Sequence, residues 1–133
     1  MRKRTQSREC ALKILYQSDI LRRAISIVLD NYFIEYQQLD PVVKEFTSRI
    51  CKGIEKNSEI IDEKITVSAT NWQLSRMATI DRNVLRIGVF ELLYAEDIPP
   101  KVTINEAVDL AKKYGDVESS KFVNGILDKI HKS

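Results

Sequence analysis

Apolar residues recur three and four positions apart along almost the whole chain, and no segment alternates apolar with polar residues as a half-buried strand does. The pattern therefore predicts helices and no sheet. We expect helices over about residues 5–21, 24–37, 41–56, 60–67, 78–94, 103–114 and 117–131. The fold class that follows is all-α, with about seven helices in two small bundles.

Three helix ends carry clear sequence signals. Asp40 followed by Pro41 marks a helix start, because Asp caps the first turn and Pro fits the first helical position. Thr103 with Glu106 three residues later matches a capping box, which predicts a second helix start there. Gly115 is a suitable residue to end that helix.

The helices are expected to form two halves of one domain. We predict an N-terminal bundle over about residues 1–68 and a C-terminal bundle over about residues 72–133. The short polar segment 68–71 is the expected joint, with Trp72 packed into it. The helix over residues 78–94 is apolar almost all round, so it should be buried on every side as the central element of the second half.

The net charge of only +2 excludes a protein that is coated uniformly with basic residues for nucleic-acid binding. The charges are nevertheless unevenly distributed. Residues 1–23 contain seven basic and two acidic side chains, whereas residues 24–100 contain eight basic and twelve acidic ones. A basic end on a mildly acidic body indicates one surface that faces phosphates.

The residues that enzymes and metal sites commonly need are scarce. The two cysteines, Cys10 and Cys51, are 41 residues apart, and the single histidine, His131, lies near the C-terminus. A zinc site needs about four clustered thiolate or imidazole ligands, and the four glycines are too scattered for a phosphate-binding loop. We therefore expect neither enzymatic activity nor a metal or cofactor. Unpaired cysteines and the lack of a long apolar run favour a cytoplasmic protein without a membrane span.

The first expected helix carries a candidate RNA-binding ridge. Arg8, Leu12 and Tyr16 are spaced by four residues, which places them on one flank of the helix. The basic residues that precede this ridge are Arg2, Lys3 and Arg4. Cations bind phosphates and an aromatic ring stacks a splayed base, so this group suits single-stranded RNA. The alternative is that Leu12 and Tyr16 face the second bundle and that the basic segment only increases solubility.

The last expected helix carries a second candidate surface. Phe122, Gly125 and Lys129 fall together to one side of its apolar stripe. An aromatic ring at the edge of the core, beside a glycine that lets another chain approach, predicts a platform for an RNA base. The alternative is that Phe122 is an ordinary core residue and that Gly125 permits close helix packing.

Four segments of the sequence resemble motifs of the NusB family of transcription antitermination factors. They are RECALKILYQ at 8–17, DRNVLRIGVFELLY at 81–94, IPPKVTINEAVDLAKKYG at 98–115 and KFVNGILDKI at 121–130. The resemblance covers nearly the whole chain in order. It implies a fold of two helical bundles, one of three helices and one of four.

The resemblance also implies a function. Members of the NusB family are non-enzymatic factors of processive antitermination, notably on ribosomal RNA operons. They bind the boxA element of the nascent leader transcript as a heterodimer with a small-subunit ribosomal protein known as NusE. The complex then joins RNA polymerase and other Nus factors. We therefore expect single-stranded boxA RNA and NusE as the direct partners.

The resemblance further implies roles for individual residues. The arginine-rich N-terminus binds RNA in such proteins, and here Arg4 and Arg8 match that region. Tyr16 matches the family's Leu-Tyr pair, and Phe122 lies in the Lys-Phe-Val-Asn-Gly motif, whose aromatic residue is associated with RNA contact. The complete RNA-binding set that we expect is Arg2, Lys3, Arg4, Arg8, Tyr16, Lys121, Phe122 and Lys129. The partner protein is expected on the central helix of the second half, at Arg76, Asp81 and Arg82.

One feature departs from the family pattern. Thr5, Gln6 and Ser7 interrupt the arginine cluster that many members have ahead of the Arg-Glu pair. Binding to fewer phosphates predicts weaker affinity, with a salt slope that is shallower by about 0.7 for each phosphate of a single strand that is left unbound. We therefore expect poor RNA affinity in the absence of the partner.

Three alternatives stay open at the level of the sequence. The chain resembles, in its fold, the N-terminal RNA-binding module of ribosomal RNA cytosine methyltransferases. It could also be a helical scaffold that binds only proteins. Some family members self-associate through the surface that otherwise binds RNA, so a homodimer is the third alternative.

Overall fold

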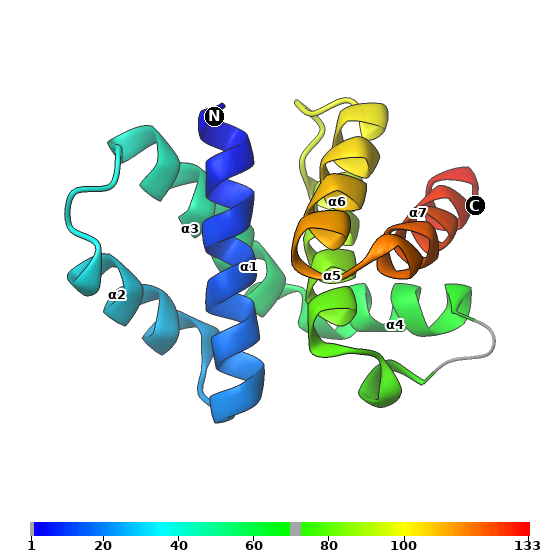
Figure 1. Cartoon of the computed structure of the whole chain (residues 1–133), viewed down its shortest axis with the longest axis horizontal. Helices are drawn as coiled ribbons and strands as arrows, with labels where there is room; N and C mark the ends of the chain where they lie inside the picture. The colour runs from blue at the N-terminus through cyan, green and yellow to red at the C-terminus, as the bar shows by residue number, and fades with distance from the viewer. Residues whose placement is uncertain (1, 70–72) are drawn as a thin grey trace.

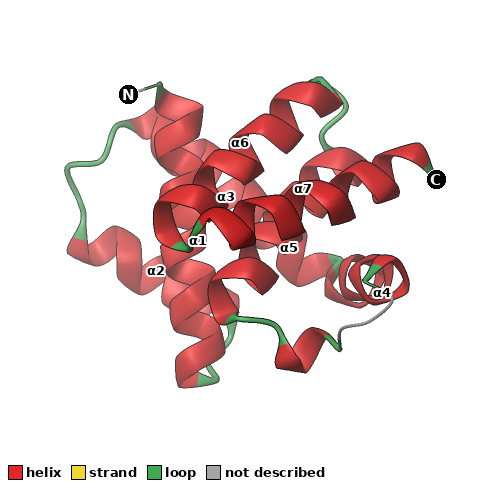
Figure 2. Cartoon of the chain, turned by 45° about the vertical axis from the view of Figure 1, so that its right-hand side comes forward, coloured by secondary structure: helices red, strands yellow, loops and turns green. Residues whose placement is uncertain are grey.

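The computed structural model describes residues 2–69 and 73–133, and this part of the chain contains seven α-helices, one short 3-10 helix and no strand (Figures 1 and 2). In chain order these are α1 (Lys3–Leu21), α2 (Ile25–Glu35), α3 (Pro41–Lys56), α4 (Ser58–Ser68), η1 (Leu74–Arg76), α5 (Thr79–Tyr94), α6 (Pro100–Tyr114) and α7 (Val117–Lys132). The prediction of an all-α protein is confirmed. None of the helices in these ranges is long and apolar enough to cross a membrane.

The helices separate into a group of three and a group of four. Helices α1 to α3 lie in one half of the molecule and α4 to α7 in the other (Figure 1). Helix α4 packs mainly on α5 and α7 and touches α3, the helix before it, only slightly. The halves therefore meet at Asn57, one helix earlier than the joint expected at residues 68–71. The apolar stripe of α4, Ile61 and Ile65, is fully buried in the second half, which explains the difference. The prediction for Trp72 lies outside the described residues.

Helix α5 is the central element, as its all-round apolar pattern predicts. It packs against α1, α3, α4, α6 and α7. Gly88 lets α7 approach closely, since a Cβ atom at this position would lie 2.6 Å from the side chain of Leu127. One apolar core runs through both halves and includes Ile50 of α3, Val84 of α5 and Leu127 of α7. The two halves therefore share a core and are not independent domains.

The predicted helix starts are correct in one case and wrong in another. The side chain of Asp40 caps α3 and accepts a hydrogen bond from the backbone N–H of Val42 at 2.8 Å. The capping box predicted at Thr103 and Glu106 is wrong, because α6 begins at Pro100, a residue well suited to the first helical position. Thr103 and Glu106 instead bind side chains of other helices.

Candidate nucleic-acid interface

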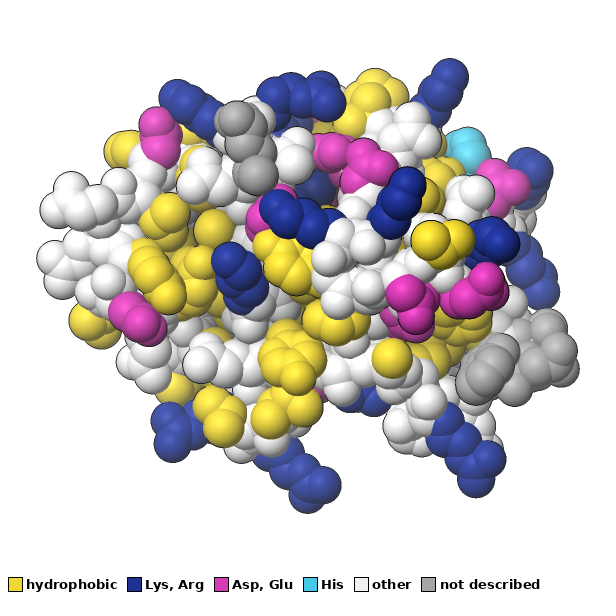
Figure 3. Space-filling view, viewed as in Figure 1, with side chains coloured by type: hydrophobic (Ala, Val, Ile, Leu, Met, Phe, Trp, Pro, Cys, Tyr) yellow, Lys and Arg dark blue, Asp and Glu magenta, His cyan; other side chains and the backbone are white. Residues whose placement is uncertain are grey.

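The first turn of α1 carries exposed cations at one end of the molecule, where Figure 3 shows Lys and Arg side chains along the upper edge. Arg2 occupies the N-cap position of α1, makes no side-chain capping hydrogen bond and is exposed. Lys3 and Arg4 are also exposed, but each contacts a carboxylate of this chain. Lys3 Nζ lies 3.2 Å from Asp40 Oδ2, and Arg4 Nη2 lies 3.4 Å from Asp97 Oδ2. These three predicted RNA-binding residues therefore lie together and remain accessible from solvent.

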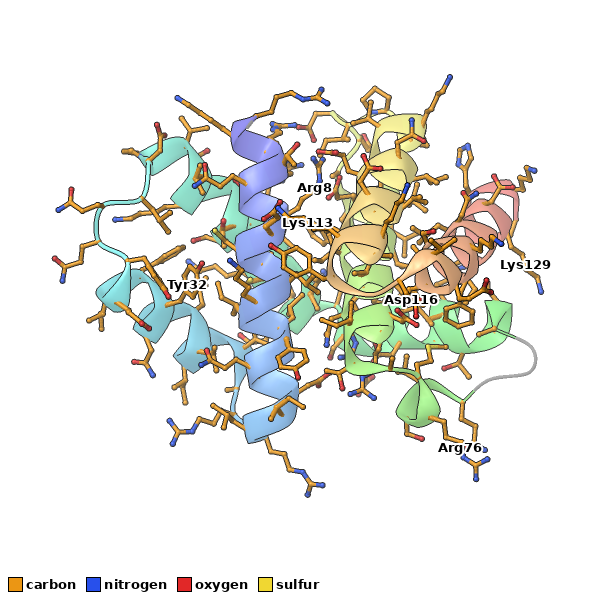
Figure 4. All side chains as sticks on the ribbon, in the orientation of Figure 1. Arg8, Tyr32, Arg76, Lys113, Asp116 and Lys129 are labelled. Atoms are coloured by element: carbon orange, nitrogen blue, oxygen red, sulfur yellow. The ribbon has the colours of Figure 1, made fainter. Side chains whose placement is uncertain are left out.

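Arg8 lies in the interior, in a network of hydrogen bonds that joins α1 to α5 and α6 (Figure 4). Its guanidinium donates to both carboxylate oxygens of Glu91 at 2.8 Å and to Glu106 at 2.9 Å. Thr103 donates a further hydrogen bond to Glu91, and Thr5 donates one to Glu106. Burial alone lowers the pKa of Arg8, but the hydrogen bonds and charges of the two carboxylates outweigh burial and raise that pKa.

This position corrects the prediction that Arg8 binds RNA. Only 3% of its side chain is exposed, so a phosphate could reach the guanidinium only by breaking the network with Glu91 and Glu106. The helical spacing placed Arg8 on the same ridge as Tyr16. In the first turns of α1, however, this side of the helix faces the second half of the molecule. Arg8 is a residue that joins the two halves of the fold.

Tyr16 lines a groove that the sequence alone did not indicate. The groove has a volume of about 480 Å³, and its walls include Tyr32 of α2, Tyr36 at the end of that helix and Tyr114 of α6. The rings of Tyr32 and Tyr36 lie 4.6 Å apart. Tyr16 is 41% exposed, so a planar group could stack on its ring from solvent. We call this feature the tyrosine groove; Ile80 of α5 also lines it.

Phe122 lines a second hollow, which we call the phenylalanine pocket. It has a volume of about 430 Å³ and is lined by Arg76, Met77, Ala78, Asp81, Asp116, Glu118, Ser119 and Phe122. Phe122 is half-buried and also packs against the apolar core. The alternative role for Gly125 is wrong, because a Cβ atom there would meet nothing within 4 Å. The surface beside Gly125 is therefore open to an approaching chain.

The two lysines of α7 that were predicted to bind RNA, Lys121 and Lys129, lie at different positions along the helix. Lys121 is exposed, with its Nζ 3.6 Å from the Glu118 carboxylate. Lys129 is exposed farther along α7 (Figure 4) and donates to the backbone oxygen of Ser68 at 3.4 Å. Lys121 therefore lies next to Phe122, whereas Lys129 lies toward the end of α4.

The phenylalanine pocket also contains a carboxylate oxygen that lacks a donor. Asp81 Oδ1 is buried and accepts no hydrogen bond from the described residues. Burial raises the pKa of Asp81, a hydrogen bond from Ser119 lowers it, and the nearby Asp116 carboxylate raises it further, so that the net direction is upward. Asp81 is therefore a wall residue of the pocket with one buried acceptor that is not satisfied within the described part of the chain.

The predicted partner-binding residues are not equivalent. Arg76 is exposed on η1, and both Arg76 and Asp81 line the phenylalanine pocket. Arg82 instead donates to Asp19 at 3.0 Å and to the backbone oxygen of Leu74 at 3.3 Å, with 17% of its side chain exposed. Arg82 therefore ties α5 to α1 and to η1, and its role in partner binding stays a prediction.

The two hollows flank one ridge. Ile80 and Tyr114 line the tyrosine groove, whereas Asp81 and Asp116 line the phenylalanine pocket. The start of α5 and the turn between α6 and α7 contribute residues to both hollows and therefore lie between them. An extended strand that crosses this ridge could contact Tyr16 on one side and Phe122 on the other.

The seven packed helices present exposed cations and two hollows that are lined by aromatic rings. These features define the class of protein: a helical protein with a nucleic-acid-binding surface. The sequence model of the NusB family matches residues 5–132. The chain therefore belongs to the NusB family.

Individual relatives agree with this assignment. The transcription antitermination protein NusB of Anaeromyxobacter dehalogenans is 44% identical over 96% of this chain and 89% of its own length. A crystal form of T. maritima NusB is 40% identical and superposes with a TM-score of 0.91, over 100% of this chain and 92% of the other. A crystal structure of the antitermination factors NusB and NusE in complex with dsRNA is 30% identical to this chain. It gives a TM-score of 0.89 over 99% of this chain and 98% of the matched one.

Proposed function

We propose that this protein is a transcription antitermination factor that binds boxA-type single-stranded RNA together with NusE and promotes processive transcription of ribosomal RNA operons. The observation that carries the proposal is the ridge between two aromatic hollows, which suits an extended RNA strand. The likeness to a NusB that is bound to NusE and dsRNA supports the same choice of partners. RNA polymerase and other Nus factors are then indirect partners, and the site of action is the cytoplasm.

The role that we propose for each group in RNA binding follows from its chemistry. Exposed cations such as Arg2, Arg4 and Lys121 hold phosphates and set the position of the strand. Tyr16 and Phe122 stack splayed bases, which is worth about 1–3 kcal/mol per base. Arg8 acts indirectly, because it fixes α1 against the second half.

The proposed surface for NusE lies next to the phenylalanine pocket. Helix α4 contacts η1, which carries Arg76. The outer face of α4 exposes Ile60 and Val67, and the acidic residues Glu59 and Glu63 are exposed on the same helix. Apolar side chains among carboxylates suit a basic ribosomal protein. A partner on this face would lie close enough to the pocket to share a bound RNA.

The deciding experiment is a titration of a labelled boxA-like RNA with this protein, with and without NusE. A scrambled RNA of the same length and composition is the control. We expect weak binding by the protein alone, and tighter binding with a preference for the boxA-like sequence when NusE is present. Equal affinity for both RNAs in the presence of NusE would contradict the proposal. A complex with NusE that takes up no RNA would favour the scaffold alternative.

A further inference from the structure

Asp97, in the segment between α5 and α6, binds arginines from two other helices. Arg49 of α3 donates from both terminal nitrogens to the two Asp97 oxygens, at 3.1 and 2.6 Å. Arg4 of α1 donates to Asp97 Oδ2 at 3.4 Å. Two guanidinium groups thus converge on a single carboxylate, in an arrangement that leaves one positive charge in excess.

We propose that Arg4 and Arg49 form a phosphate-binding site for the RNA backbone and that Asp97 occupies this site when no RNA is bound. A carboxylate and a phosphate present similar paired oxygens to a guanidinium fork, and both bind it with two parallel hydrogen bonds. Asp97 therefore fills the place that a backbone phosphate would take. This inference rests on the proposed binding of RNA and adds Arg49, which the sequence did not single out.

The site is built to keep its shape when the carboxylate leaves. The ring of Phe46 lies beneath both guanidinium groups, with its centre 4.6 Å from Arg4 and 5.8 Å from Arg49. Phe46 itself is buried in the core. Cation–π contact of this kind holds an arginine in place without using its hydrogen-bond donors. The two arginines can therefore exchange a carboxylate for a phosphate while they stay over the same ring.

The site is accessible to RNA. Of the side chains involved, Arg4 and Asp97 are each 48% exposed and Arg49 is 36% exposed. Arg4 and Asp97 line a groove of about 360 Å³, together with Arg2. A phosphate can therefore approach from solvent and displace the carboxylate without unfolding any helix.

Occupation by Asp97 weakens RNA binding, because the phosphate that enters this site must first displace an internal anion. The hydrogen bonds and charge of Arg49 hold the pKa of Asp97 well below its usual range, so the carboxylate stays charged at neutral pH. Near neutrality, the competition between Asp97 and a phosphate therefore does not change with pH. It depends on the concentrations of RNA and salt. This competition is a second reason, besides the interrupted arginine cluster, to expect weak RNA affinity.

The test compares Asp97→Asn with Asp30→Asn. The first change keeps the size of the side chain and removes its charge. Asp30 is exposed on α2, so its replacement changes the net charge equally. We expect Asp97→Asn to bind the boxA-like RNA about fivefold more tightly than Asp30→Asn does, the effect of one charge at about 4 Å in water. Its salt slope should be steeper by about 0.7 for each additional phosphate that the protein binds. Adding Arg49→Gln to Asp97→Asn should remove the increase in affinity.

A second readout does not depend on RNA recognition. The Nε–H signals of Arg4 and Arg49 should shift when inorganic phosphate is titrated into Asp97→Asn, and shift less in the wild type at the same concentration. Equal RNA affinities of the two Asn variants, or no phosphate-dependent shift at Arg4 and Arg49, would overturn the inference. A wild-type protein that binds no RNA with NusE would instead contradict the proposed function, while the phosphate titration would still decide this site.

Discussion

Replacement of Arg8 by Met should destabilise the protein strongly and affect RNA binding only through the fold. The change keeps an apolar stem of similar length and removes the guanidinium. It leaves Glu91, whose side chain is 1% exposed, without its charged partner. Removing one member of a buried ion pair costs about 3–5 kcal/mol, since the remaining charge stays buried. For a domain of this size, the midpoint of thermal unfolding should fall by about 10–20 °C.

Thermal unfolding followed by circular dichroism measures this effect, and Arg4→Met is the matched control. Arg4 is on the same helix and its guanidinium is exposed, so its loss should change the midpoint little. Adding Glu91→Gln to Arg8→Met should recover part of the lost stability, because the unpaired charge is removed while Thr103 can still donate to the new amide oxygen. An unchanged melt for Arg8→Met together with a loss of RNA affinity would refute the burial argument and make Arg8 a direct RNA contact.

Three further predictions concern the fold. Gly53→Ala should lower the free energy of unfolding by about 1–3 kcal/mol, because a Cβ atom there would overlap the buried ring of Phe90. A denaturant midpoint equal to that of the wild type would contradict this prediction. Arg22 ends α1 in a left-handed conformation with φ 54°, so Arg22→Gly should raise the free energy of unfolding by about 0.5–1 kcal/mol, whereas Arg23→Gly should not. The hydroxyl of Tyr114 donates to Glu9 at 2.6 Å, and burial together with this bond raises its pKa to about 12. The unfolded tyrosine ionises near 10, so the wild type should lose stability relative to Tyr114→Phe as the pH rises from about 10 to about 12. Parallel stability curves of the two proteins over that range would count against this assignment.

The helical pattern was sufficient to predict most of the fold. Apolar residues at spacings of three and four are a local signal, so the helices and the central position of α5 follow from the sequence directly. The boundary between the halves did not follow, because both Asn57 and the segment 68–71 are short polar breaks. Only the packing of Ile61 and Ile65 on the second half distinguishes them.

The candidate site was harder to predict, because its parts depend on contacts between distant segments. Arg8 and Tyr16 lie on one flank of α1, but the spacing does not tell which end of that flank is covered by α5 and α6. Thr103 and Glu106 match a capping box locally, and their binding to Glu91 and Arg8 is visible only in the folded chain. In each case, a contact with a distant segment determines what the residue does, and the local sequence pattern does not.

The tyrosine groove illustrates a missed signal. Tyr32 and Tyr36 are four residues apart, so their shared face was detectable in the sequence, but nothing local indicates that Tyr16 and Tyr114 face the same groove. Arg49 was missed for a similar reason. It lies in a helix with a clear apolar stripe, and its role depends on Asp97, which is 48 residues away in the sequence.

The measurement that tests the central claim most directly is the affinity of Phe122→Leu and Tyr16→Leu for a boxA-like RNA in the presence of NusE. Leucine keeps apolar packing and removes the flat ring, and Tyr94→Leu is the control because Tyr94 is an exposed tyrosine of α5 outside both hollows. We predict that each of the two variants binds about 5- to 150-fold more weakly than the control, which corresponds to about 1–3 kcal/mol of stacking, with little change in the melt. Affinities equal to that of Tyr94→Leu for both variants would contradict an RNA path across the ridge between the tyrosine groove and the phenylalanine pocket.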